Sequence, residues 1–287
     1  MSLTEEKIYS LKIKANLIRE SIIEMLLEAK SGHTAGPLGM ADIFTYFYFH
    51  ALNHDPKNPS LEDRDRVVLS NGHICPVLYA TMAHAGYFPI EELKTLRKFG
   101  SRLQGHPHRE FLSFVETSSG PLGSGYSQAC GMALADKIDC RDNSRFIYCF
   151  LGDGELNEGN NWEAFMFAAK NKLNNLIAIV DRNNIQIDGF TENIMPLADL
   201  AKKFESFNFK VIEINGHNFR EIDTAINLAH QEKEKPSVII AYTIPGKGVK
   251  EFERDYHWHG KAPNKDEADM ALRELRTLSG KIKAEHQ

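Results

Sequence analysis

The sequence predicts an α/β protein with a doubly wound, mostly parallel sheet and helices on both faces. The first observation is a pair of continuous apolar runs at residues 146–151 and 176–180, which are typical of strands buried on both sides. The second is the segment between them, where Trp162, Phe165 and Leu173 recur at helical spacing. A strand, a helix and a strand within about 30 residues indicate two parallel strands joined by a crossover helix.

The N-terminal part predicts two helices ahead of this unit, within residues 4–52. Apolar side chains repeat at spacings of three and four behind Thr4, a good capping residue, and Gly32 ends this first helix. The second helix begins at Pro37, which suits a first helical turn, and ends near Ala51. A loop, a short strand and a helix follow, at residues 53–65, 66–70 and 75–85.

The C-terminal half predicts two further strands, at residues 211–214 and 238–242, with a helix near residues 220–230 between them. A polar stretch then ends in a surface helix at about residues 265–283. No internal repeat, low-complexity tract or Pro/Gly-rich linker interrupts the sequence. We therefore expect residues 1–287 to form a single domain.

Composition argues against several classes of protein. With 42% hydrophobic and 25% charged residues, the chain is an ordinary globular sequence. A net charge of −5 argues against nucleic-acid binding through bulk positive charge, and no apolar run approaches the roughly 20 residues of a membrane helix. The cysteines lack C-x-x-C spacing, and three of the four lie in apolar surroundings, which predicts free thiols in a reducing cytoplasm. They are Cys75, Cys130, Cys140 and Cys149.

Polar residues follow both apolar runs, where parallel strands present their carboxyl ends. Gly152-Asp153-Gly154 follows the first run, and Asn183 lies just after the second. If the two strands are neighbours, Asp153 and Asn183 face each other across a strand spacing of about 5 Å. A carboxylate, an amide oxygen and a backbone carbonyl suit Mg²⁺, whose shell is usually completed by phosphate oxygens. Because only one carboxylate is available, we expect a diphosphate to supply the remaining charge.

Glycines beside these residues fit a phosphate ligand. Gly152 and Gly154 allow a close approach of the backbone, and a helix beginning near Asn157 would point its free N–H groups at the anion. A second Gly-rich segment, residues 120–125, also opens a helical run but has neither dinucleotide-binding nor P-loop spacing. Taken alone, each segment is more often a simple turn. Polar segments at two successive strand ends favour the metal–diphosphate interpretation.

Four histidines stand next to glycine at the ends of predicted segments: His33, His73, His106 and His259. A lone loop histidine is most often solvated, but glycine lets these four approach a ligand closely. Imidazoles suit proton transfer and stabilisation of developing charge near neutral pH. No Cys–His spacing indicates zinc, and no G-x-S-x-G motif indicates a serine hydrolase. The other histidines are expected to be structural or exposed: His50, His54, His84, His108, His217, His230 and His286.

With these motifs in this order, the sequence resembles the thiamine-diphosphate domain of transketolase. Residues 152–184 are similar to the family's cofactor motif, which opens with Gly-Asp-Gly and closes with asparagine. Further transketolase-like signatures are Ser31-Gly32-His33 with residues 36–41, Leu69-Ser70-Asn71-Gly72-His73, Gly120-Pro121-Leu122-Gly123 and Trp258-His259-Gly260-Lys261. The resemblance covers about residues 15–263. It implies the doubly wound fold that binds the diphosphate end of thiamine diphosphate.

The resemblance also implies ligands for the cofactor and its metal ion. Asp153 and Asn183, with the carbonyl of Ile185, would hold Mg²⁺, or Ca²⁺ or Mn²⁺ in its place. Further cofactor contacts would come from His73 and Gly154 at the diphosphate, from Gly120, and from Leu122 and Ile187 packed on the thiazolium ring.

For catalysis, the resemblance implies that His33, His106 and His259 line the approach to the reactive carbon, bind substrate hydroxyls and move protons. His259 would also contact the cofactor. His257 stands two residues before it, and the Trp-His-Gly context favours His259. Glu158 would belong to a carboxylate contact between the two cofactor sites of a dimer.

Chain length adds a partner to this expectation. A full transketolase continues into a pyrimidine-binding domain and a third domain, and no segment of these 287 residues matches them. The resemblance therefore implies the N-terminal subunit of a split transketolase. With a separate C-terminal subunit, in a heterotetramer with two copies of each, it would transfer a two-carbon ketol unit from a ketose phosphate to an aldose phosphate. The partner would supply the glutamate that assists cofactor deprotonation and the residues that bind the substrate phosphate.

Alternatives stay open at this point, as do the identities of the two sugar phosphates and the pathway, for which the pentose phosphate pathway is one setting. A deoxyxylulose-phosphate synthase-like enzyme or a 2-oxo-acid decarboxylating enzyme would keep the cofactor and change the substrate, although the histidines favour sugar hydroxyls. A catalytically silent assembly subunit would be expected to lose cofactor residues, and none of those named is lost.

Overall fold

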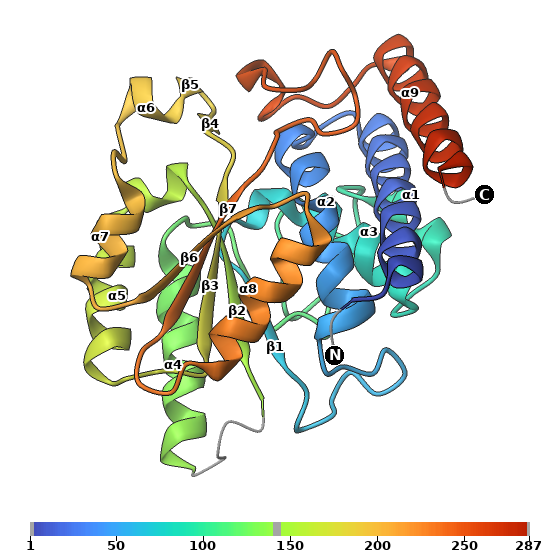
Figure 1. The fold of residues 1–287 in the computed structure, drawn as a ribbon. Helices are drawn as coiled ribbons and strands as arrows, with labels where there is room; N and C mark the ends of the chain where they lie inside the picture. Colours follow the sequence, from blue (N-terminus) through green and yellow to red (C-terminus); the bar gives the residue numbers. More distant parts are fainter. Residues whose placement is uncertain (1–2, 140–144, 286–287) are drawn as a thin grey trace.

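A five-stranded parallel sheet forms the centre of the computed structural model, which describes residues 3–139 and 145–285 (Figure 1). In spatial order its strands are β1 (Arg66–Leu69), β2 (Ile147–Gly152), β3 (Leu176–Arg182), β7 (Ser237–Tyr242) and β6 (Lys210–Asn215). Each strand pairs in parallel with its neighbour. The predicted doubly wound α/β fold is confirmed, and the two apolar runs of the sequence form the adjacent strands β2 and β3.

The two central strands are apolar throughout because both faces of the sheet are covered. In β2, Tyr148 and Phe150 belong to one core cluster, whereas Cys149 and Leu151 belong to the other. The same alternation continues through β3 and β7. Successive side chains of a strand point to opposite faces, so a continuous apolar run is the pattern expected for a strand between two layers of helices.

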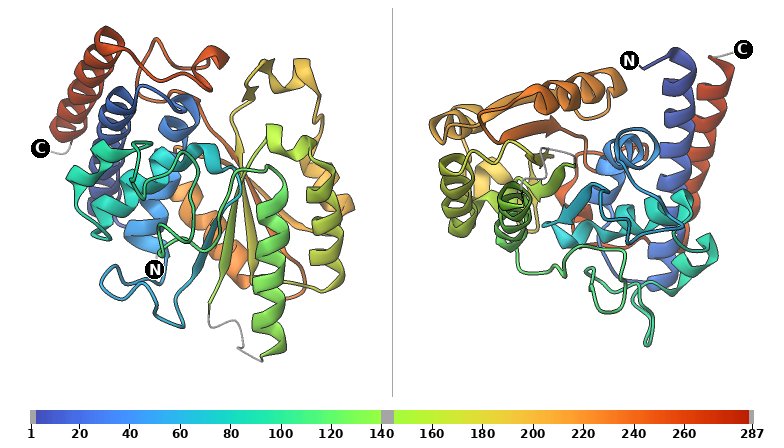
Figure 2. Two further views of the ribbon diagram at one scale, coloured as in Figure 1. Left: turned by 180° about the vertical axis from the view of Figure 1, so that it is seen from behind. Right: turned by 90° about the horizontal axis from the view of Figure 1, so that it is seen from below.

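Helices cover each face of the sheet, and Figures 1 and 2 show the two layers from different sides. One layer contains α2 (Ala35–Tyr46), α3 (Cys75–Ala85) and α8 (Phe219–Gln231) and, further from the sheet, α1 (Glu5–Ala29) and α9 (Lys265–Ala284). The other layer contains α4 (Ser124–Ile138), α5 (Gly159–Lys170) and α7 (Leu200–Ser206). The helices α1 and α9, from opposite ends of the chain, lie side by side in the first layer.

Two helix boundaries near the N-terminus differ from the sequence-based expectation. Lys30, rather than Gly32, takes the left-handed position that ends α1, with φ of 55° and its N–H donating to the Leu26 carbonyl. The helix α2 begins at Ala35, ahead of Pro37, and residues 47–51 continue it as a wider π-helical turn. One residue in the left-handed conformation is enough to end a helix, and lysine can adopt this conformation at a modest cost in free energy. The position of the nearest glycine therefore does not determine where α1 ends.

A small hairpin rises from the carboxyl end of β3. Its strands β4 (Ile185–Gln186) and β5 (Gly189–Phe190) pair antiparallel and lead into the short helix α6 (Thr191–Ile194). Figure 1 shows the hairpin and α6 projecting beyond the sheet at this edge. The hairpin therefore places residues 185–190 beside the strand ends, where a parallel sheet binds its ligands.

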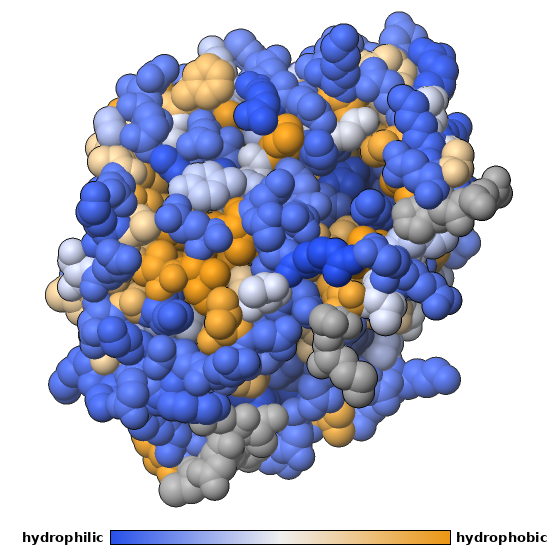
Figure 3. All heavy atoms as spheres, viewed as in Figure 1, coloured by the Kyte–Doolittle hydropathy of each residue, from blue (hydrophilic) through white to orange (hydrophobic). Residues whose placement is uncertain are grey.

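The sheet ends at β6, whose outer edge pairs with no further strand in the part of the chain that the structure describes. Val211 and Ile212 of β6 are only partly buried. Figure 3 shows apolar residues gathered on this face of the molecule, over the region of β6 and α7, within a largely hydrophilic surface. Among residues 3–139 and 145–285, no helix has the length and apolar character needed to cross a membrane.

The thiols of Cys75, Cys130 and Cys149 are free and buried, as predicted. Two sequence-based expectations, for Cys140 and His286, lie outside the described residues.

Candidate active site

The carboxyl ends of β2 and β3 meet at one edge of the sheet. Gly152 pairs with Asp181 in the parallel register, and the Asp153 N–H donates to the Asp181 carbonyl at 3.2 Å. A cavity of about 410 Å³ lies at this edge. It is lined by candidate residues from distant parts of the sequence, namely His33, His73, His106, Gly120, Leu122, Asp153, Gly154, Asn183, Ile185, Ile187 and His259. The fold thus brings these segments together around one space.

Asp153 is almost completely buried beneath this cavity, with 1% of its surface exposed. Its Oδ1 accepts from the Gly154 N–H at 2.7 Å. Its Oδ2 accepts from the Asn184 N–H at 2.7 Å and from the Arg182 guanidinium at 3.0 Å. Burial raises the pKa of Asp153 to about 6, although Arg182 and the backbone donors act in the opposite direction. The chain therefore holds a carboxylate here whose charge is incompletely compensated.

Asn183 is oriented by a chain of hydrogen bonds at the end of β3. Its Nδ2 donates to Asp181 Oδ2 at 2.7 Å, and its Oδ1 accepts from the Ile185 N–H at 3.0 Å. The hydroxyl of Thr243 donates to the other Asp181 oxygen at 2.5 Å. Burial, with a contribution from Asp153, raises the pKa of Asp181 to about 7. The next residue, Asn184, takes a positive φ of 63°, which asparagine tolerates well, and so turns the chain into β4.

Glu155, which the sequence interpretation passed over, joins the two Gly-rich segments. Its carboxylate accepts from the Gly123 N–H at 2.7 Å, from the Gly152 N–H at 3.0 Å, and from the Ser70 hydroxyl. The Ser70 oxygen in turn accepts from the Gly125 N–H at 3.1 Å. A buried carboxylate with these donors fixes three segments relative to one another. Glu155 directly follows Gly-Asp-Gly, but its partners lie too far away in sequence for local spacing to identify them.

The turn around Glu155 also corrects a predicted helix start. The helix expected near Asn157 begins at Gly159, because a 3-10 turn, η4 (Gly154–Asn157), comes first. The Asp153 carboxylate caps this turn through the Gly154 N–H, and Glu155 bends back to the end of β2. The 3-10 turn therefore occupies the residues between the end of β2 and the start of α5.

The polar groups around the cavity fit a bound cation together with an anionic ligand. Asp153, Asp181 and Glu155 are all buried carboxylates, and Arg182 is the buried cation that contacts Asp153. Both side-chain polar atoms of Asn71 are buried without a hydrogen-bond partner, as is Nε2 of Gln186. Buried polar groups are rarely left unpaired, so these atoms indicate a polar ligand in the cavity. None of Asn71, Asp181, Gln186 or the cavity-lining Asp188 had been assigned a role from the sequence.

A metal ion here would need oxygens from several sources. In the described part of the chain, no group of three His, Cys, Asp or Glu side chains is arranged to hold a metal ion. The candidate donors at the strand ends are instead the Asp153 carboxylate, the Asn183 amide oxygen and the Ile185 carbonyl, which are oxygen ligands suited to Mg²⁺, Ca²⁺ or Mn²⁺. The residues therefore fit a hard cation whose remaining ligands belong to a bound phosphate.

Three of the candidate histidines form a compact cluster above the strand ends. The ring centroids of His33, His73 and His259 are separated by 5.0 Å (His33–His73), 5.5 Å (His33–His259) and 5.1 Å (His73–His259). Burial lowers the pKa of His33 to about 3 and that of His259 to about 4, and it also lowers the pKa of His73. His106 lines the same cavity beside Gly120. Neutral imidazoles at neutral pH can both donate and accept hydrogen bonds.

The two histidines near the C-terminus have different surroundings. His259 lines the cavity, whereas 67% of the His257 side chain is exposed and its Nδ1 lies 2.7 Å from the Asp255 carboxylate. The structure therefore brings His259, and not His257, to the candidate site.

The three remaining predicted residues lie at the edge of the cavity or outside it. Leu122 is 37% exposed and Ile187 is 69% exposed, and both line the cavity as apolar side chains accessible from outside. Glu158 is exposed and stands at the N-cap of α5 without lining the cavity. Its position leaves the carboxylate accessible to another molecule.

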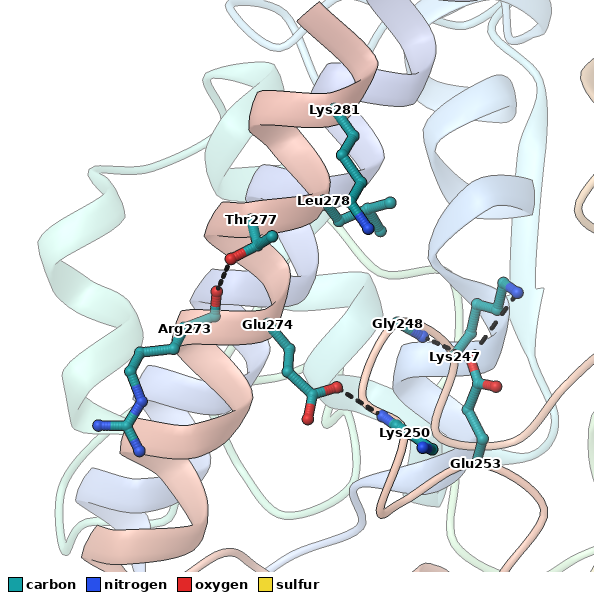
Figure 4. Close-up of a pocket in the computed structure, with 9 residues that line it drawn as sticks. All are labelled: Lys247, Gly248, Lys250, Glu253, Arg273, Glu274, Thr277, Leu278 and Lys281. Atoms are coloured by element: carbon teal, nitrogen blue, oxygen red, sulfur yellow. Dashed lines mark hydrogen bonds and ion pairs between the residues drawn. The ribbon is translucent and has the colours of Figure 1, made fainter. Parts of the chain in front are cut away.

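A separate hollow of about 470 Å³ lies between α9 and the loop of residues 247–253 (Figure 4). Figure 4 shows Glu274 reaching from α9 to the loop, where it accepts from the Lys250 N–H at 2.7 Å. Glu253 accepts from the Gly248 N–H at 3.0 Å, and its carboxylate lies 3.7 Å from Lys247 Nζ. These contacts tie the loop to itself and to the helix, and the hollow shares no residue with the cavity at the strand ends.

Comparison with known proteins identifies the relatives of this chain. Residues 11–280 match the family described as "Transketolase, thiamine diphosphate binding domain". The chain is 40% identical over 273 residues to 6-deoxy-6-sulfo-D-fructose transketolase subunit SqwG of Clostridium sp. (strain MSTE9), covering 95% of this chain and 98% of that protein. It is 41% identical over 270 residues to an apulose-4-phosphate transketolase subunit of Actinobacillus succinogenes, covering 93% of this chain and 96% of that protein. The transketolase structure from Campylobacter jejuni superposes with a TM-score of 0.86 at 36% identity, over 94% of this chain and 42% of that one.

Proposed function

Because this chain belongs to the transketolase family and matches its thiamine-diphosphate-binding domain, we propose that it is the N-terminal subunit of a split transketolase. With a separate C-terminal subunit it transfers a two-carbon ketol unit from a ketose phosphate to an aldose phosphate. The observation that carries this proposal is the match over 98% and 96% of two proteins that are themselves named as transketolase subunits. The cavity at the strand ends supports it, because all of the candidate cofactor residues except Glu158 line this cavity.

The metal ion is the first part of the proposed cofactor site. Asp153 and Asn183 would hold Mg²⁺ through their side chains and Ile185 through its carbonyl, with Ca²⁺ or Mn²⁺ as substitutes. The buried, incompletely compensated charge of Asp153 and Asp181 supports this assignment, because a divalent cation beside them would favour their ionised forms. Arg182 would keep Asp153 oriented, and the Asn183 amide would be held by Asp181.

The organic part of the cofactor would occupy the rest of the cavity. Thiamine diphosphate supplies a nucleophilic ring carbon and an electron sink for breaking a C–C bond. His73, Gly120 and Gly154 would bind it, and Leu122 and Ile187 would exclude water from its ring. The unpartnered Asn71 amide at the same cavity is a further donor for a phosphate oxygen.

His33, His106 and His259 would act on the substrate. Their lowered pKa values keep them neutral near pH 7, so each ring can donate a hydrogen bond from one nitrogen and accept one at the other. Neutral rings suit the binding of sugar hydroxyls and the movement of a proton to or from a substrate oxygen. The close packing of His33 against His259 makes a second positive charge costly, which favours one proton being moved at a time.

The assembly would contain two copies of each subunit. The relatives that this chain covers almost completely are named as transketolase subunits, which supports a partner that carries the pyrimidine-binding and third domains. The exposed position of Glu158 supports a contact between neighbouring cofactor sites across a subunit interface. We also treat residues 1–287 as one domain, supported by the packing of α1 on α9, and place it in the cytoplasm, supported by three buried free thiols.

The proposed ketol transfer is compatible with several sugar substrates. One relative is named for 6-deoxy-6-sulfo-D-fructose and another for apulose 4-phosphate, so the relatives are named for different sugars. The proposal for this chain is ketol transfer between sugars carrying an anionic group.

The test is reconstitution. The purified chain should be inactive alone and should transfer the ketol unit from xylulose 5-phosphate to ribose 5-phosphate when mixed with its C-terminal partner and thiamine diphosphate. Asp153→Asn should abolish this activity and metal-dependent cofactor binding, whereas the matched variant Asp199→Asn, at the exposed cap of α7, should retain both. Activity on pyruvate without ketol transfer would contradict the proposal, as would an active complex that contains Asp153→Asn.

A further inference from the structure

A network of buried polar groups joins α1 and α2 to the turn between β6 and α8. Asp42 of α2 is 6% exposed, and its two carboxylate oxygens accept from the Arg19 guanidinium at 3.1 and 2.6 Å. Nδ1 of His217 lies 2.7 Å from the same carboxylate. Burial acts to raise the pKa of Asp42, but Arg19 and His217 outweigh it and hold this pKa below its ordinary value. Because Arg19 already neutralises the carboxylate, compensation of charge alone does not explain the contact with His217.

The backbone after β7 fixes the orientation of the His217 ring. The Ile244 N–H donates to Nε2 of His217 at 2.8 Å, so this nitrogen is the acceptor and carries no proton. The ring proton then lies on Nδ1 and is donated to Asp42. A carboxylate that accepts from one imidazole nitrogen fixes the tautomer and the orientation of the ring, as it does for histidines that bind metal ions. Here the group that the other nitrogen holds is a backbone N–H.

The peptide group that His217 holds lies next to the proposed metal ligands. It joins Thr243 to Ile244, and the Thr243 hydroxyl donates to Oδ1 of Asp181. The other carboxylate oxygen of Asp181 accepts from the Asn183 amide at 2.7 Å. Thr243 and Asp181 are both buried, so these hydrogen bonds are shielded from water. A displacement of this peptide group would therefore be passed through two hydrogen bonds to the Asn183 side chain.

The segment of residues 243–246 is attached to α2 at two points. The Gly246 N–H donates at 2.8 Å to the carbonyl of Ala35, the first residue of this helix. The second attachment runs through the His217 ring to Asp42. Loss of the His217 ring would remove the second attachment and leave the first in place. The peptide group beside the metal ligands would then lose its support while the rest of the segment stays anchored.

We propose that His217, oriented by Asp42, is a positioning residue for the metal ion of the cofactor. It holds the end of β7 where Thr243 can orient Asp181 and, through it, the Asn183 amide. This inference rests on the proposed thiamine diphosphate function and deepens it, because it assigns a role in metal binding to a residue that does not line the cavity. Groups that orient the ligands of a metal ion typically contribute about 10–100-fold to its affinity.

The first experiment uses the isolated chain without cofactor. In NMR spectra the His217 ring should carry its proton on Nδ1, and the Ile244 N–H should be protected from hydrogen exchange. His217→Leu removes both hydrogen bonds of the ring and should speed the exchange of this N–H at least about tenfold. His217→Gln should keep most of the protection, because its amide can donate with the nitrogen and accept with the oxygen.

A matched control separates this contact from a general loss of stability. His84→Leu removes another half-buried histidine, which makes a hydrogen bond to Ser21 between α3 and α1, and it should leave the Ile244 N–H protected. A proton on Nε2 of His217 in the wild type, or unchanged exchange of the Ile244 N–H in His217→Leu, would overturn the proposal.

The second experiment measures the Mg²⁺ requirement of the complex with the partner subunit. The Mg²⁺ concentration that half-saturates thiamine diphosphate binding in calorimetry should rise at least about tenfold in His217→Leu. It should stay near the wild-type value in His217→Gln and in His84→Leu. At saturating Mg²⁺ and cofactor, kcat for ketol transfer by His217→Leu should return close to the wild-type value, because the metal ligands themselves are unchanged.

The outcomes of this second experiment distinguish the inference from the proposed function. An unchanged Mg²⁺ requirement in His217→Leu, or an equal rise in His84→Leu, would overturn the positioning role. A raised Mg²⁺ requirement in His217→Leu, in a complex whose wild type shows no ketol transfer, would keep the positioning role and reject the proposed function.

Discussion

Replacing His259 by asparagine should make the folded chain less sensitive to acid. His259 is packed against His33 and His73, and burial lowers its pKa from the ordinary value of 6.5 to about 4. Between these two values the unfolded chain binds a proton that the folded chain excludes. The folded state therefore keeps its full stability above pH 6.5 and loses stability as the pH falls toward 4.

The size of this effect follows from the shift in pKa. One pKa unit corresponds to about 1.36 kcal/mol, so at about pH 5, roughly 1.5 units below the unfolded value, His259 alone lowers the free energy of unfolding by about 2 kcal/mol. His33, whose pKa is lowered to about 3, should add a similar loss. Because the charge of His259 is one cause of the low pKa of His33, removing His259 should also relieve part of the second loss.

The assay is urea unfolding at about pH 7.5 and about pH 5 for the wild type, His259→Asn and His257→Asn, without cofactor. The wild type should lose about 2 kcal/mol more than His259→Asn between the two conditions. His257→Asn removes a neighbouring ring that is exposed and paired with Asp255, so it should follow the wild type. Equal losses in the wild type and His259→Asn would refute the argument that folding buries a neutral His259.

Three further predictions concern the segments around the cavity. Gly125→Ala should destabilise the chain by about 1–3 kcal/mol, because its Cβ would lie 2.5 Å from Cβ of Ser70, whereas Gly131→Ala in the same helix meets open space and should stabilise it by up to about 1 kcal/mol; thermal unfolding distinguishes the two. Glu155→Gln should cost about 1–3 kcal/mol in urea unfolding, because the Gly123 and Gly152 N–H groups donate to different oxygens of the carboxylate and the amide nitrogen would face one of them as a second donor. Chelation of divalent cations should abolish tight thiamine diphosphate binding in calorimetry, and added Mg²⁺ should restore it; equal affinity with and without the cation would contradict the metal assignment.

The fold could be predicted from the sequence where the signal is local. The runs that became β2 and β3 are apolar at every position, and this pattern requires helices on both faces. Once these strands are neighbours, the meeting of Asp153 and Asn183 follows from the parallel register alone. The order of the outer strands was not predictable in this way, since β7 pairs between β3 and β6 through contacts that no periodicity encodes.

The same distinction explains which candidate site residues could be predicted from the sequence. Asp153 and the four histidines next to glycine belong to short motifs of consecutive residues, which can be recognised without knowing the fold. Glu155 acts through residues of other segments, such as Ser70, 85 positions earlier, so nothing adjacent to Glu155 in sequence indicates its contacts.

Charge is distributed unevenly around the cavity at the strand ends. Buried carboxylates, Asp153 and Asp181, stand at the strand ends, where a cation and its diphosphate would bind. The imidazoles of His33, His73 and His259 lie beside these carboxylates, and burial lowers the pKa of each ring, so they add no positive charge near neutral pH. Buried negative charge favours a ligand of the opposite sign, so the strand ends favour a cation, whereas the neutral rings favour uncharged polar groups such as hydroxyls.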